Sequence, residues 1–458
     1  MSDGLGSEGN PLKVLIVGSG PSGFYAADAL LKADTTVEVD ILDRLPTPFG
    51  LVRAGVAPDH AKIKSATKAY DKISDNPNVS FLGNVTFGRD VSLAEIQATH
   101  HAVIFTCGAE SDRRLGIPGE DLAGSHTATE FVYWYNGHPD YRDHVFDLSQ
   151  EVAVIIGQGN VAADVCRILA KTVDELKNTD IAEHALDALS QSKIRDIHMI
   201  GRRGPAQAKF THAELKEFGE LADCDPVIDP AILDLNAASQ AELEDKTNRS
   251  AIKNIETLTA FSQRPAGSKS RRLHFRFLEG PTELKGGEHL AAVTLMKNRL
   301  EGEAFNQWAE ETGETVDLPC GLLFRSIGYR GVPVPDIPFD DKKGVFPNKE
   351  GRITNDGSVL PGVYCAGWIK RGPSGIIGTN RPDSVETVGS LLADLSGLDA
   401  SQKPGGAGLR TLLEGKGVRV VSYEDWQKID AAEIAKGEAK GKPREKFTRI
   451  NDMLAALS

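Results

Sequence analysis

A glycine-rich turn close to the start of the chain has the spacing of a dinucleotide-binding loop. The run GSGPSG at residues 18–23 fits the pattern G-x-G-x-x-G. In such a loop Gly18 permits a tight turn, Gly20 lets the backbone approach a pyrophosphate, and Gly23 lets the following helix pack on the preceding strand. Asp43 ends the next apolar run, where a carboxylate can accept hydrogen bonds from ribose hydroxyls. The spacing predicts a cradle for a dinucleotide; a glycine turn in an unrelated α/β domain is the alternative.

A second loop of the same kind occurs at residues 157–162, where GQGNVA carries alanine in place of the third glycine. The fingerprint tolerates that exchange, and Gly159 takes the position that faces a pyrophosphate. The next strand of this unit ends in GRRG at residues 201–204 and not in an acid. The guanidinium groups of Arg202 and Arg203 can hold a 2′-phosphate through paired hydrogen bonds, whereas an acid would repel it. We therefore predict NADP(H) rather than NAD(H) here; a solvated surface pair is the alternative.

The order of the two loops along the chain suggests which cofactor each one holds. Pro21 follows the second glycine of the first loop, and this loop lies at the very start of the chain. Both features are typical of flavoproteins that bind FAD, and so is a second dinucleotide unit inserted between parts of the first. Nicotinamide supplies a hydride, and flavin accepts it and can release one electron at a time. The expected chemistry is hydride transfer from NADPH to FAD.

Apolar runs indicate the elements that must position these residues. Runs without alternation precede the two glycine loops, at residues 12–18 and 152–157, and suit parallel strands that are covered on both faces. Further strands are expected at residues 37–43, 101–107, 197–201, 323–327 and 362–366. Helices are expected at residues 24–33, 163–171 and 172–192, from about 375–379 through 388, and at the end of the charged tail that begins at 397.

Together these elements predict an α/β protein with two Rossmann-like domains. The NADP domain, residues 109–324, is inserted into a discontinuous FAD domain, residues 1–108 and 325–458, whose second segment carries the C-terminal tail. A chain of 458 residues is too long for one core, which agrees with this division. Within the NADP domain, alternating apolar residues at 272–278 and 291–300 predict additional strands.

Composition and charge exclude several classes of function. The net charge of −13 argues against binding nucleic acid through the overall field. No apolar run approaches the roughly 18 residues of a membrane span, and residues 1–10 lack the features of a signal or transit peptide. The five cysteines are scattered without a C-x-x-C pair, which argues against disulfides, structural zinc and a bound cluster. We expect no metal, no nucleic-acid partner, no membrane insertion and a cytoplasmic, bacterial location.

The absence of a redox cysteine pair also bears on where the electrons go. Disulfide reductases of this architecture carry a C-x-x-C or C-x4-C beside the flavin, and this chain has neither. The electrons must leave to an outside acceptor: a protein carrier, a quinone, oxygen or an organic substrate. Residues 264–276 are rich in arginine and contain no acid. That stretch suits an acidic carrier, and a solvated strand and loop is an equally open alternative.

The sequence as a whole resembles adrenodoxin reductase and the bacterial ferredoxin–NADP+ reductases of the adrenodoxin-reductase type. The similarity runs from Lys13 to near the C-terminus and depends on specific motifs. These are PFGLVR at 48–53, GVAPDH at 55–60, GQGNVAAD at 157–164, GRRGP at 201–205, GWIKRGPSG at 367–375 and GKPREK at 441–446. The resemblance implies an FAD-dependent reductase that moves electrons from NADPH to a one-electron iron–sulfur carrier of the ferredoxin type.

The resemblance also implies roles for individual residues around FAD. Besides the fingerprint glycines, the residues that would line the nucleotide are Ser22, Asp43, Leu51 and Phe87. Phe87 replaces the valine usual in the family, which matters little if its contact is through the backbone. Trp368 would pack against the flavin. Gly375, Ile376 and Ile377 would present backbone N–H groups to the pyrimidine edge, where a helix N-terminus favours negative charge.

Around NADP the implied roles fall on the second unit. The residues that would contact the pyrophosphate are Gln158, Gly159, Asn160 and Val161. Arg202 and Arg203 would bind the 2′-phosphate. Glu214 would orient the adenosine or nicotinamide half, and Gly375 would lie close to the nicotinamide.

A candidate catalytic pair is implied by the same resemblance. His60 would lie near the flavin and pair with Glu217, either to tune the flavin potential or to position the nicotinamide. An ordinary structural ion pair is the alternative, because hydride transfer itself needs no general base. Asp164, on the helix after the second fingerprint, has the same two interpretations.

The sequence therefore predicts a ferredoxin–NADP+ reductase activity with two alternatives. One alternative is an NADPH diaphorase or quinone reductase without a dedicated protein carrier. The other is a non-catalytic subunit that uses its nucleotides to bind a larger complex, although no cluster motif or partner tail favours it.

Overall fold

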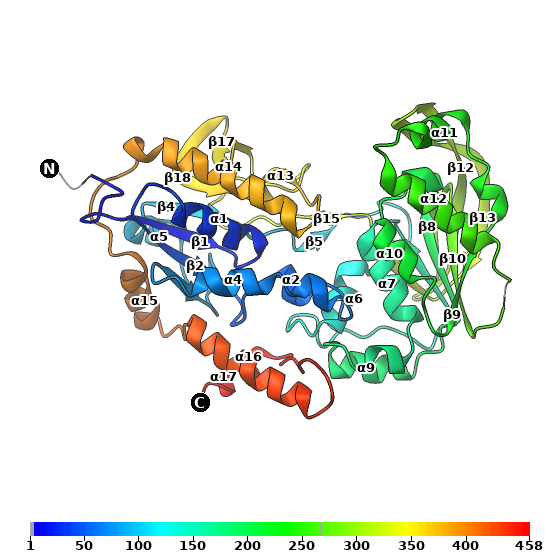
Figure 1. Ribbon diagram of the computed structural model, residues 1–458, viewed down its shortest axis with the longest axis horizontal. Helices are drawn as coiled ribbons and strands as arrows, with labels where there is room; N and C mark the ends of the chain where they lie inside the picture. Colours follow the sequence, from blue (N-terminus) through cyan, green and yellow to red (C-terminus); the bar gives the residue numbers. More distant parts are fainter. Residues whose placement is uncertain (1–3, 266) are drawn as a thin grey trace.

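The computed structural model describes residues 4–265 and 267–458 and forms two lobes (Figure 1). A seven-stranded sheet in the order β16-β17-β18-β4-β1-β2-β3 forms the first lobe. Its strands are β1 (Leu12–Val17), β2 (Val37–Leu42), β3 (Val79–Leu82), β4 (Ala102–Phe105), β16 (Asn348–Lys349), β17 (Arg352–Asn355) and β18 (Ser358–Cys365). From β18 to β3 all pairs are parallel, and the edge strands β16 and β17 are antiparallel.

Helices cover both faces of this sheet. Helices α1 (Pro21–Leu31) and α14 (Asn380–Ala393) lie against each other on one face, and α5 (Leu93–Thr99) and α15 (Gly405–Gly415) cover the other. Residues of β1 alternate between the two buried clusters beneath these helices. The strand before the first glycine loop is apolar throughout because both of its faces are buried.

The second lobe contains a six-stranded sheet in the order β6-β14-β7-β8-β10-β9, in which every pair is parallel. Its strands are β6 (Ser125–Thr127), β7 (Val152–Ile156), β8 (Asp196–Gly201), β9 (Cys224–Ile228), β10 (Arg271–Phe277) and β14 (Leu322–Arg325). Helix α7 (Asn160–Ala170) follows β7 as α1 follows β1. Each lobe thus presents a glycine loop at the carboxyl end of a parallel strand, where open α/β sheets bind their ligands.

An antiparallel sheet of three strands is inserted between β10 and β14. It contains β11 (Glu279–Gly286), β12 (Leu290–Glu303) and β13 (Asn306–Pro319), and it lies at the outer end of the second lobe (Figure 1). The alternation expected at residues 272–278 corresponds to β10, where Leu273, Phe275 and Phe277 are buried. The alternation at 291–300 corresponds to β12.

Strand membership supports the domain boundary at 108, whereas β14 ends at Arg325, one residue beyond the boundary at 324; we retain the division as a proposal. The first sheet takes its strands from residues before 106 and after 347, whereas the second takes them from 125–325. Where the chain crosses between lobes, the short strands β5 (Ser111–Asp112) and β15 (Tyr329–Arg330) pair antiparallel. The predicted α/β fold with two Rossmann-like units is confirmed.

The C-terminal segment is helical, as expected, and connects the lobes. After α15 it forms α16 (Tyr423–Glu438), runs along the first lobe, and turns back through a loop that meets the second lobe (Figure 1). Within this loop Lys442 Nζ donates to the carbonyl of Ile181 at 2.6 Å. Among the residues that the structure describes, no helix is both long enough and apolar enough to span a bilayer.

The helix expected to open near residues 375–379 begins one residue after that range. The glycine at 375 has a φ of +82°, which lies outside the right-handed helical region. A single 3-10 turn covers Ile377–Thr379, and α14 starts only at Asn380. The segment 372–379 is therefore a loop that ends at a helix N-terminus.

Candidate active site

The first glycine loop connects β1 to α1 and leaves one position open. Gly18 has a φ of +112°, and a Cβ there would lie 2.7 Å from the carbonyl oxygen of Thr106. A Cβ on Gly23 would lie 2.2 Å from the Gly18 carbonyl oxygen, so these two glycines are required by the chain itself. A Cβ on Gly20 would meet nothing within 4 Å, and its φ of −79° suits any residue. The chain does not explain Gly20, whereas a ligand lying against it does.

The first helix also lacks a cap. No side chain caps the N-terminus of α1, although Ser92, Thr127, Thr172 and Ser422 form capping boxes on other helices. Its first-turn N–H groups are left for a ligand, and a pyrophosphate suits both their donors and the positive end of the helix dipole. The residues at this turn therefore fit the phosphate part of a dinucleotide.

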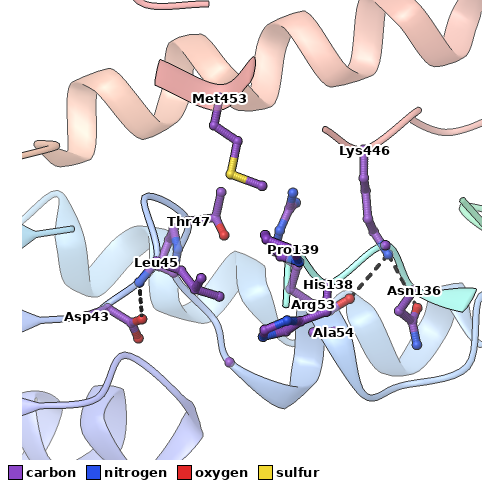
Figure 2. Close-up of a pocket in the computed structure, with 13 residues that line it drawn as sticks. Asp43, Leu45, Thr47, Arg53, Ala54, Asn136, His138, Pro139, Lys446 and Met453 are labelled. Atoms are coloured by element: carbon purple, nitrogen blue, oxygen red, sulfur yellow. Dashed lines mark hydrogen bonds between the residues drawn. The ribbon is translucent and has the colours of Figure 1, made fainter. Parts of the chain in front are cut away.

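Asp43 is held in a fixed orientation beside this turn. Its Oδ2 accepts hydrogen bonds from the backbone N–H of Ser19 at 3.0 Å and from the Ser19 hydroxyl at 2.5 Å. Its Oδ1 accepts from the backbone N–H of Leu45 at 3.0 Å. A pocket opens here, and Figure 2 shows Asp43 on its wall with Arg53 and Met453. The pocket is thus bordered by both segments of the first lobe.

The second glycine loop repeats the arrangement of the first. Gly157 has a φ of +136°, and a Cβ there would lie 2.1 Å from the carbonyl oxygen of Ser326. Gly159 has an extended backbone with a φ of −104°, and a Cβ on it would meet nothing within 4 Å. No side chain caps α7, so its first-turn N–H groups are also available. Gln158 is tied back by a bond from its Nε2 to the Arg276 carbonyl at 3.0 Å.

Arg202 and Arg203 lie immediately after β8, at the edge where the second loop also lies. Neither guanidinium forms an ion pair or hydrogen bond with any residue that the structure describes, and Arg202 is exposed. Both side chains are therefore free to bind an anionic group.

Acids partly neutralise the other arginine-rich stretch, residues 264–276. Arg272 Nε lies 2.7 Å from Asp196 Oδ1, and Arg276 Nε lies 2.6 Å from Glu279 Oε2, and both acids come from strands outside the stretch. Arg264 and Arg271 instead donate to backbone carbonyls. The suggestion that this stretch attracts an acidic carrier stays a prediction.

A cluster of charged residues forms where the two lobes meet. His60, from the first lobe, places its Nε2 3.2 Å from both carboxylate oxygens of Glu217. The same nitrogen lies 3.8 Å from Glu214 Oε2, and His60 Nδ1 lies 3.9 Å from Asp164 Oδ1. Arg167, fully buried on α7, reaches Asp164 at 2.6 Å and Glu217 at 3.0 Å. The sequence pair His60–Glu217 is therefore in contact, together with Asp164.

Burial and charge shift the pKa values within this cluster. Burial disfavours the charged ring of His60, but the hydrogen bond to Glu217 together with the charges of Asp164 and Glu214 outweighs it and raises the histidine pKa. For Glu217, burial is opposed by that same bond, and its pKa is lowered. Burial, together with the charge of Asp164, raises the pKa of Glu214 to about 7. His60 and Glu217 thus form an ion pair, and Glu214 is close to half protonated at neutral pH.

Glu214 has a buried carboxylate oxygen without a hydrogen-bond partner in the part of the chain that the structure describes. It is 7% exposed, and its Oε2 accepts no hydrogen bond from the described residues. His60, Glu214 and Glu217 offer atoms within 4.8 Å of one another, a spacing that suits a metal ion. Arg167 lies against Glu217, however, and its positive charge opposes a cation at this place. An orphaned carboxylate oxygen beside the interlobe junction is better suited to a donor on a nucleotide.

The segment 367–377 returns to this region from the second part of the first lobe. Trp368 stacks near Tyr329 with ring centroids 5.3 Å apart and donates from Nε1 to the Ser374 carbonyl at 3.2 Å. Ile376 is 66% exposed, which is unusual for a large apolar side chain. An apolar side chain and free backbone N–H groups before α14 give this loop a surface that suits a flat aromatic ligand.

Comparisons with known proteins agree with this geometry. A family model described as an NAD(P)-binding Rossmann-like domain matches residues 16–82. A mitochondrial NADPH:adrenodoxin oxidoreductase of Arabidopsis thaliana is 47% identical and covers 98% of this chain and 96% of its own length. NADPH-ferredoxin reductase FprA of Mycobacterium tuberculosis is 45% identical over 97% of this chain and 98% of its own length. The structure of that FprA in complex with NADPH superposes with a TM-score of 0.93, at 43% identity, over 98% of this chain and 100% of the other.

The chain belongs to the adrenodoxin reductase family. The resemblance inferred from the motifs is thereby confirmed. Contacts between individual residues of this reductase and its cofactors remain our proposal.

The remaining FAD residues predicted for the reductase lie around the first loop. Ser22, on α1, meets the returning segment: its carbonyl accepts from Ser384 Oγ at 3.0 Å. Leu51 begins the short helix α2 (Leu51–Ala54), next to the glycine loop. Phe87 is buried, with its ring 5.0 Å from that of Phe105, so its side chain serves the core and only its backbone is available to a nucleotide.

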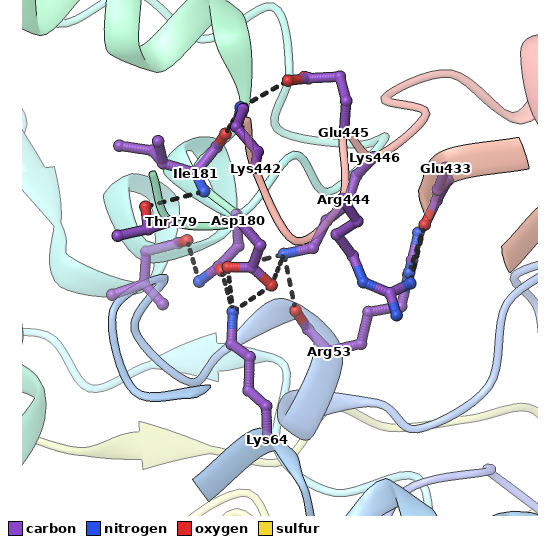
Figure 3. A network of polar contacts seen from close by, with 12 residues as sticks. Arg53, Lys64, Thr179, Asp180, Ile181, Glu433, Lys442, Arg444, Glu445 and Lys446 are labelled. Carbon is purple, nitrogen blue, oxygen red and sulfur yellow. Dashed lines mark hydrogen bonds and ion pairs between the residues drawn. The ribbon is translucent and has the colours of Figure 1, made fainter. Parts of the chain in front are cut away.

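Sequence reasoning missed a second polar network between the lobes of the reductase. Asp180 of the second lobe lies 2.5 Å from Lys64 Nζ and 3.2 Å from Lys446 Nζ; Asp180 and Lys446 are buried and Lys64 is partly buried (Figure 3). Lys446 also donates to the carbonyl of Arg53 at 3.2 Å. The motif at 441–446 contributed to the resemblance, but its sequence alone did not indicate that it connects the two lobes.

Proposed function

We propose that this reductase transfers electrons from NADPH, through bound FAD, to a one-electron iron–sulfur carrier of the ferredoxin type. The observation that carries the proposal is the pair of glycine positions, Gly20 and Gly159, which are open in the chain at the N-termini of two uncapped helices. Two such cradles face two dinucleotides. The relatives, which are named for NADPH and for adrenodoxin or ferredoxin, supply the direction of the electrons.

In the first cradle the residues fit FAD. The N-terminus of α1 and Gly20 would hold the pyrophosphate, Asp43 would accept hydrogen bonds from the ribose, and Gly18 and Gly23 would shape the turn. Trp368 and the backbone of Gly375, Ile376 and Ile377 would flank the ring system. When bound, FAD accepts a hydride from NADPH and releases the electrons one at a time.

In the second cradle the residues fit NADPH. Gln158, Gly159, Asn160 and Val161 form the turn that would hold its pyrophosphate. Arg202 and Arg203 would bind the 2′-phosphate, which explains why neither is paired with an acid among the described residues. Glu214 would receive the donor that its orphaned oxygen lacks, and we propose the amide of the nicotinamide as that donor.

His60 and Glu217 would act as positioning residues. They join the lobes at the point where the nicotinamide must lie between α7, α10 (His212–Glu217) and the loop around Gly375. A fixed charge pair there would limit the orientations open to the nicotinamide and exclude water. We assign neither residue a proton transfer.

The electrons leave to an external acceptor. The five cysteines are free in the structure, and four of them are buried, so none forms a redox pair. They also suit a reducing compartment, and we propose the bacterial cytoplasm as the location of the protein. A cluster-bearing protein is favoured over a quinone by the family relatives, whose names specify adrenodoxin or ferredoxin.

An acceptor comparison tests this function. The FAD-loaded protein is mixed without oxygen with NADPH and either a [2Fe–2S] ferredoxin or a soluble quinone, and both reductions are followed by absorbance. We expect faster reduction of ferredoxin and a strong preference for NADPH over NADH. Equal or faster quinone reduction would instead favour a diaphorase. Failure of the protein to retain FAD would contradict the assignment of FAD to the first cradle.

A further inference from the structure

The turn that carries Arg202 and Arg203 is held from behind by the three-stranded sheet. Asn298, on β12, donates from Nδ2 to the carbonyl of Arg202 at 3.2 Å. The backbone N–H of Leu278 donates to the carbonyl of Arg203 at 3.0 Å, and the Leu278 carbonyl accepts from the N–H of Asn298 at 2.7 Å. Asn298 therefore touches the turn once directly and once through Leu278.

Two further features show that this contact is built closely. Leu278 has a φ of +56°, a conformation that side chains other than glycine rarely adopt. A Cβ on Gly280 would lie 3.2 Å from Arg202 Cγ, so the absence of a side chain there lets the arginine pass along β11. A strained residue that persists beside a functional turn is over-determined by its surroundings. Here those surroundings are the two bonds to the turn and to Asn298.

The direct contacts reach backbone atoms, and the side chains of Arg202 and Arg203 stay free. Fixing both carbonyls fixes the backbone of the turn, and with it the direction of the two Cα–Cβ bonds from which the guanidinium groups extend. Paired hydrogen bonds to a phosphate require that geometry, because the planar guanidinium binds in a defined plane. Holding the turn before the ligand arrives also removes part of the ordering cost of binding.

We propose that Asn298 is a positioning residue for cofactor choice, and that the three-stranded sheet is the support of the 2′-phosphate site. The proposal rests on the proposed role of Arg202 and Arg203. It adds a residue that touches no part of the nucleotide and yet sets the preference for the phosphorylated nicotinamide.

The test compares two inhibitors that differ only in the 2′-phosphate. Inhibition of NADPH-dependent flavin reduction by 2′,5′-ADP and by 5′-AMP is measured for the FAD-loaded wild type and three variants. Asn298→Ala removes the donor, Asn298→Asp removes it while keeping the shape, and Lys297→Ala is the control. Lys297 is exposed on the same strand and pairs with Glu314 at 3.0 Å, away from the turn.

Loss of one hydrogen bond predicts that 2′,5′-ADP binds about 3- to 10-fold more weakly to Asn298→Ala. Binding of 5′-AMP and kcat with saturating NADPH should stay within about twofold, because neither depends on the direction of the guanidinium groups. Unchanged binding of 2′,5′-ADP in both Asn298 variants would overturn the proposal. So would an equal loss for both inhibitors, which would indicate a general disturbance of the lobe.

A separate arm keeps failure of the proposed function distinguishable. The double variant Arg202→Ala, Arg203→Ala should lose most of the preference for 2′,5′-ADP. If it does and the Asn298 variants do not, only the supporting role of Asn298 is wrong. If the double variant keeps the preference, the 2′-phosphate site itself is wrongly assigned.

Discussion

The two glycine loops share one backbone geometry but differ in how the rest of the chain surrounds them. Around the first loop the chain closes: Phe49 donates to the Ser19 carbonyl at 3.0 Å, and a Cβ on Gly50 would lie 3.1 Å from Gly20 Cα. Asp43 accepts three hydrogen bonds from its own chain. Around the second loop Arg202 and Arg203 have no partner among the described residues.

This difference matches two kinds of ligand. A site whose polar groups are already satisfied and whose loop is covered by distant segments suits a cofactor that stays bound. A site with free guanidinium groups, and with an orphaned carboxylate oxygen on Glu214, gains its bonds only when a ligand arrives. We interpret the first loop as a holder of FAD and the second as a dock from which NADP(H) exchanges.

The comparison depends on both cradles being held in one arrangement, and the largest effect is expected where they are joined. Replacing Asp180 with Asn leaves the buried ammonium groups of Lys64 and Lys446 without their carboxylate. Breaking a buried ion pair of this kind costs about 3–5 kcal/mol. Thermal unfolding of the FAD-loaded protein should therefore occur at a clearly lower temperature.

The matched control is Asp174→Asn. Asp174 pairs with Lys177 at 2.6 Å on the same lobe but is 84% exposed, so its loss should cost less than about 1 kcal/mol. Equal unfolding temperatures for the two variants would show that the Lys64–Asp180–Lys446 network does not hold the lobes together.

A paired substitution tests the two cradles directly. Alanine at position 20 or at position 159 meets no atom of the chain, so both variants should fold as the wild type does. The added methyl group would occupy space that a pyrophosphate needs, at a cost of about 1–3 kcal/mol or roughly 10- to 100-fold in affinity. Gly20→Ala should lose FAD on dilution, measured by flavin absorbance after gel filtration. Gly159→Ala should keep FAD and show a raised KM for NADPH.

The two variants serve as controls for each other. If Gly159→Ala also released FAD, or if Gly20→Ala retained it with unchanged affinity, the assignment of a different cofactor to each cradle would be contradicted.

The cradles themselves were predictable because their residues are close in sequence. Gly20, Asp43 and Arg202 stand at fixed places in a strand–loop–helix–strand pattern, and that pattern can be read from the letters alone. Contacts between distant segments follow no such pattern. Asp180 joins Lys64 and Lys446 only after the C-terminal segment has crossed to the second lobe.

The same reason explains why the charge of the stretch 264–276 could not be judged from the sequence. The stretch contains no acids, but parallel pairing of β10 with β8 brings Asp196 beside Arg272. Part of its positive charge is therefore matched from a neighbouring strand. The helix expected to open near 375–379 begins at Asn380, and the left-handed conformation of Gly375 before it could not be foreseen because glycine adopts either sign of φ.

The smallest expected effect concerns Glu214, an acid of the second lobe. Asp43 accepts hydrogen bonds at both carboxylate oxygens, whereas Oε2 of Glu214 accepts none from the described residues. Burial, with the charge of Asp164, raises the pKa of Glu214 to about 7 from its ordinary value of 4.5. Between pH 4.5 and 7 the folded protein therefore keeps the Glu214 proton that the unfolded chain has released. The stability that Glu214 contributes is lost as pH rises through 7. Glu214→Gln should remove that loss, which we expect to be on the order of 1 kcal/mol because His60 titrates with it.

Unfolding temperatures of wild type, Glu214→Gln and the exposed control Glu220→Gln, taken at pH 5, 6, 7 and 8, measure this difference. Wild type and the control should lose stability more steeply than Glu214→Gln over that range. Saturating NADP+ should further stabilise the ionised form of Glu214 in the wild type, because a donor amide stabilises a carboxylate more than it stabilises the protonated acid. Parallel curves of unfolding temperature against pH for all three proteins would mean that the carboxylate of Glu214 is as fully hydrogen-bonded as that of Asp43. The contrast between the two cradles would then depend on Arg202 and Arg203 alone.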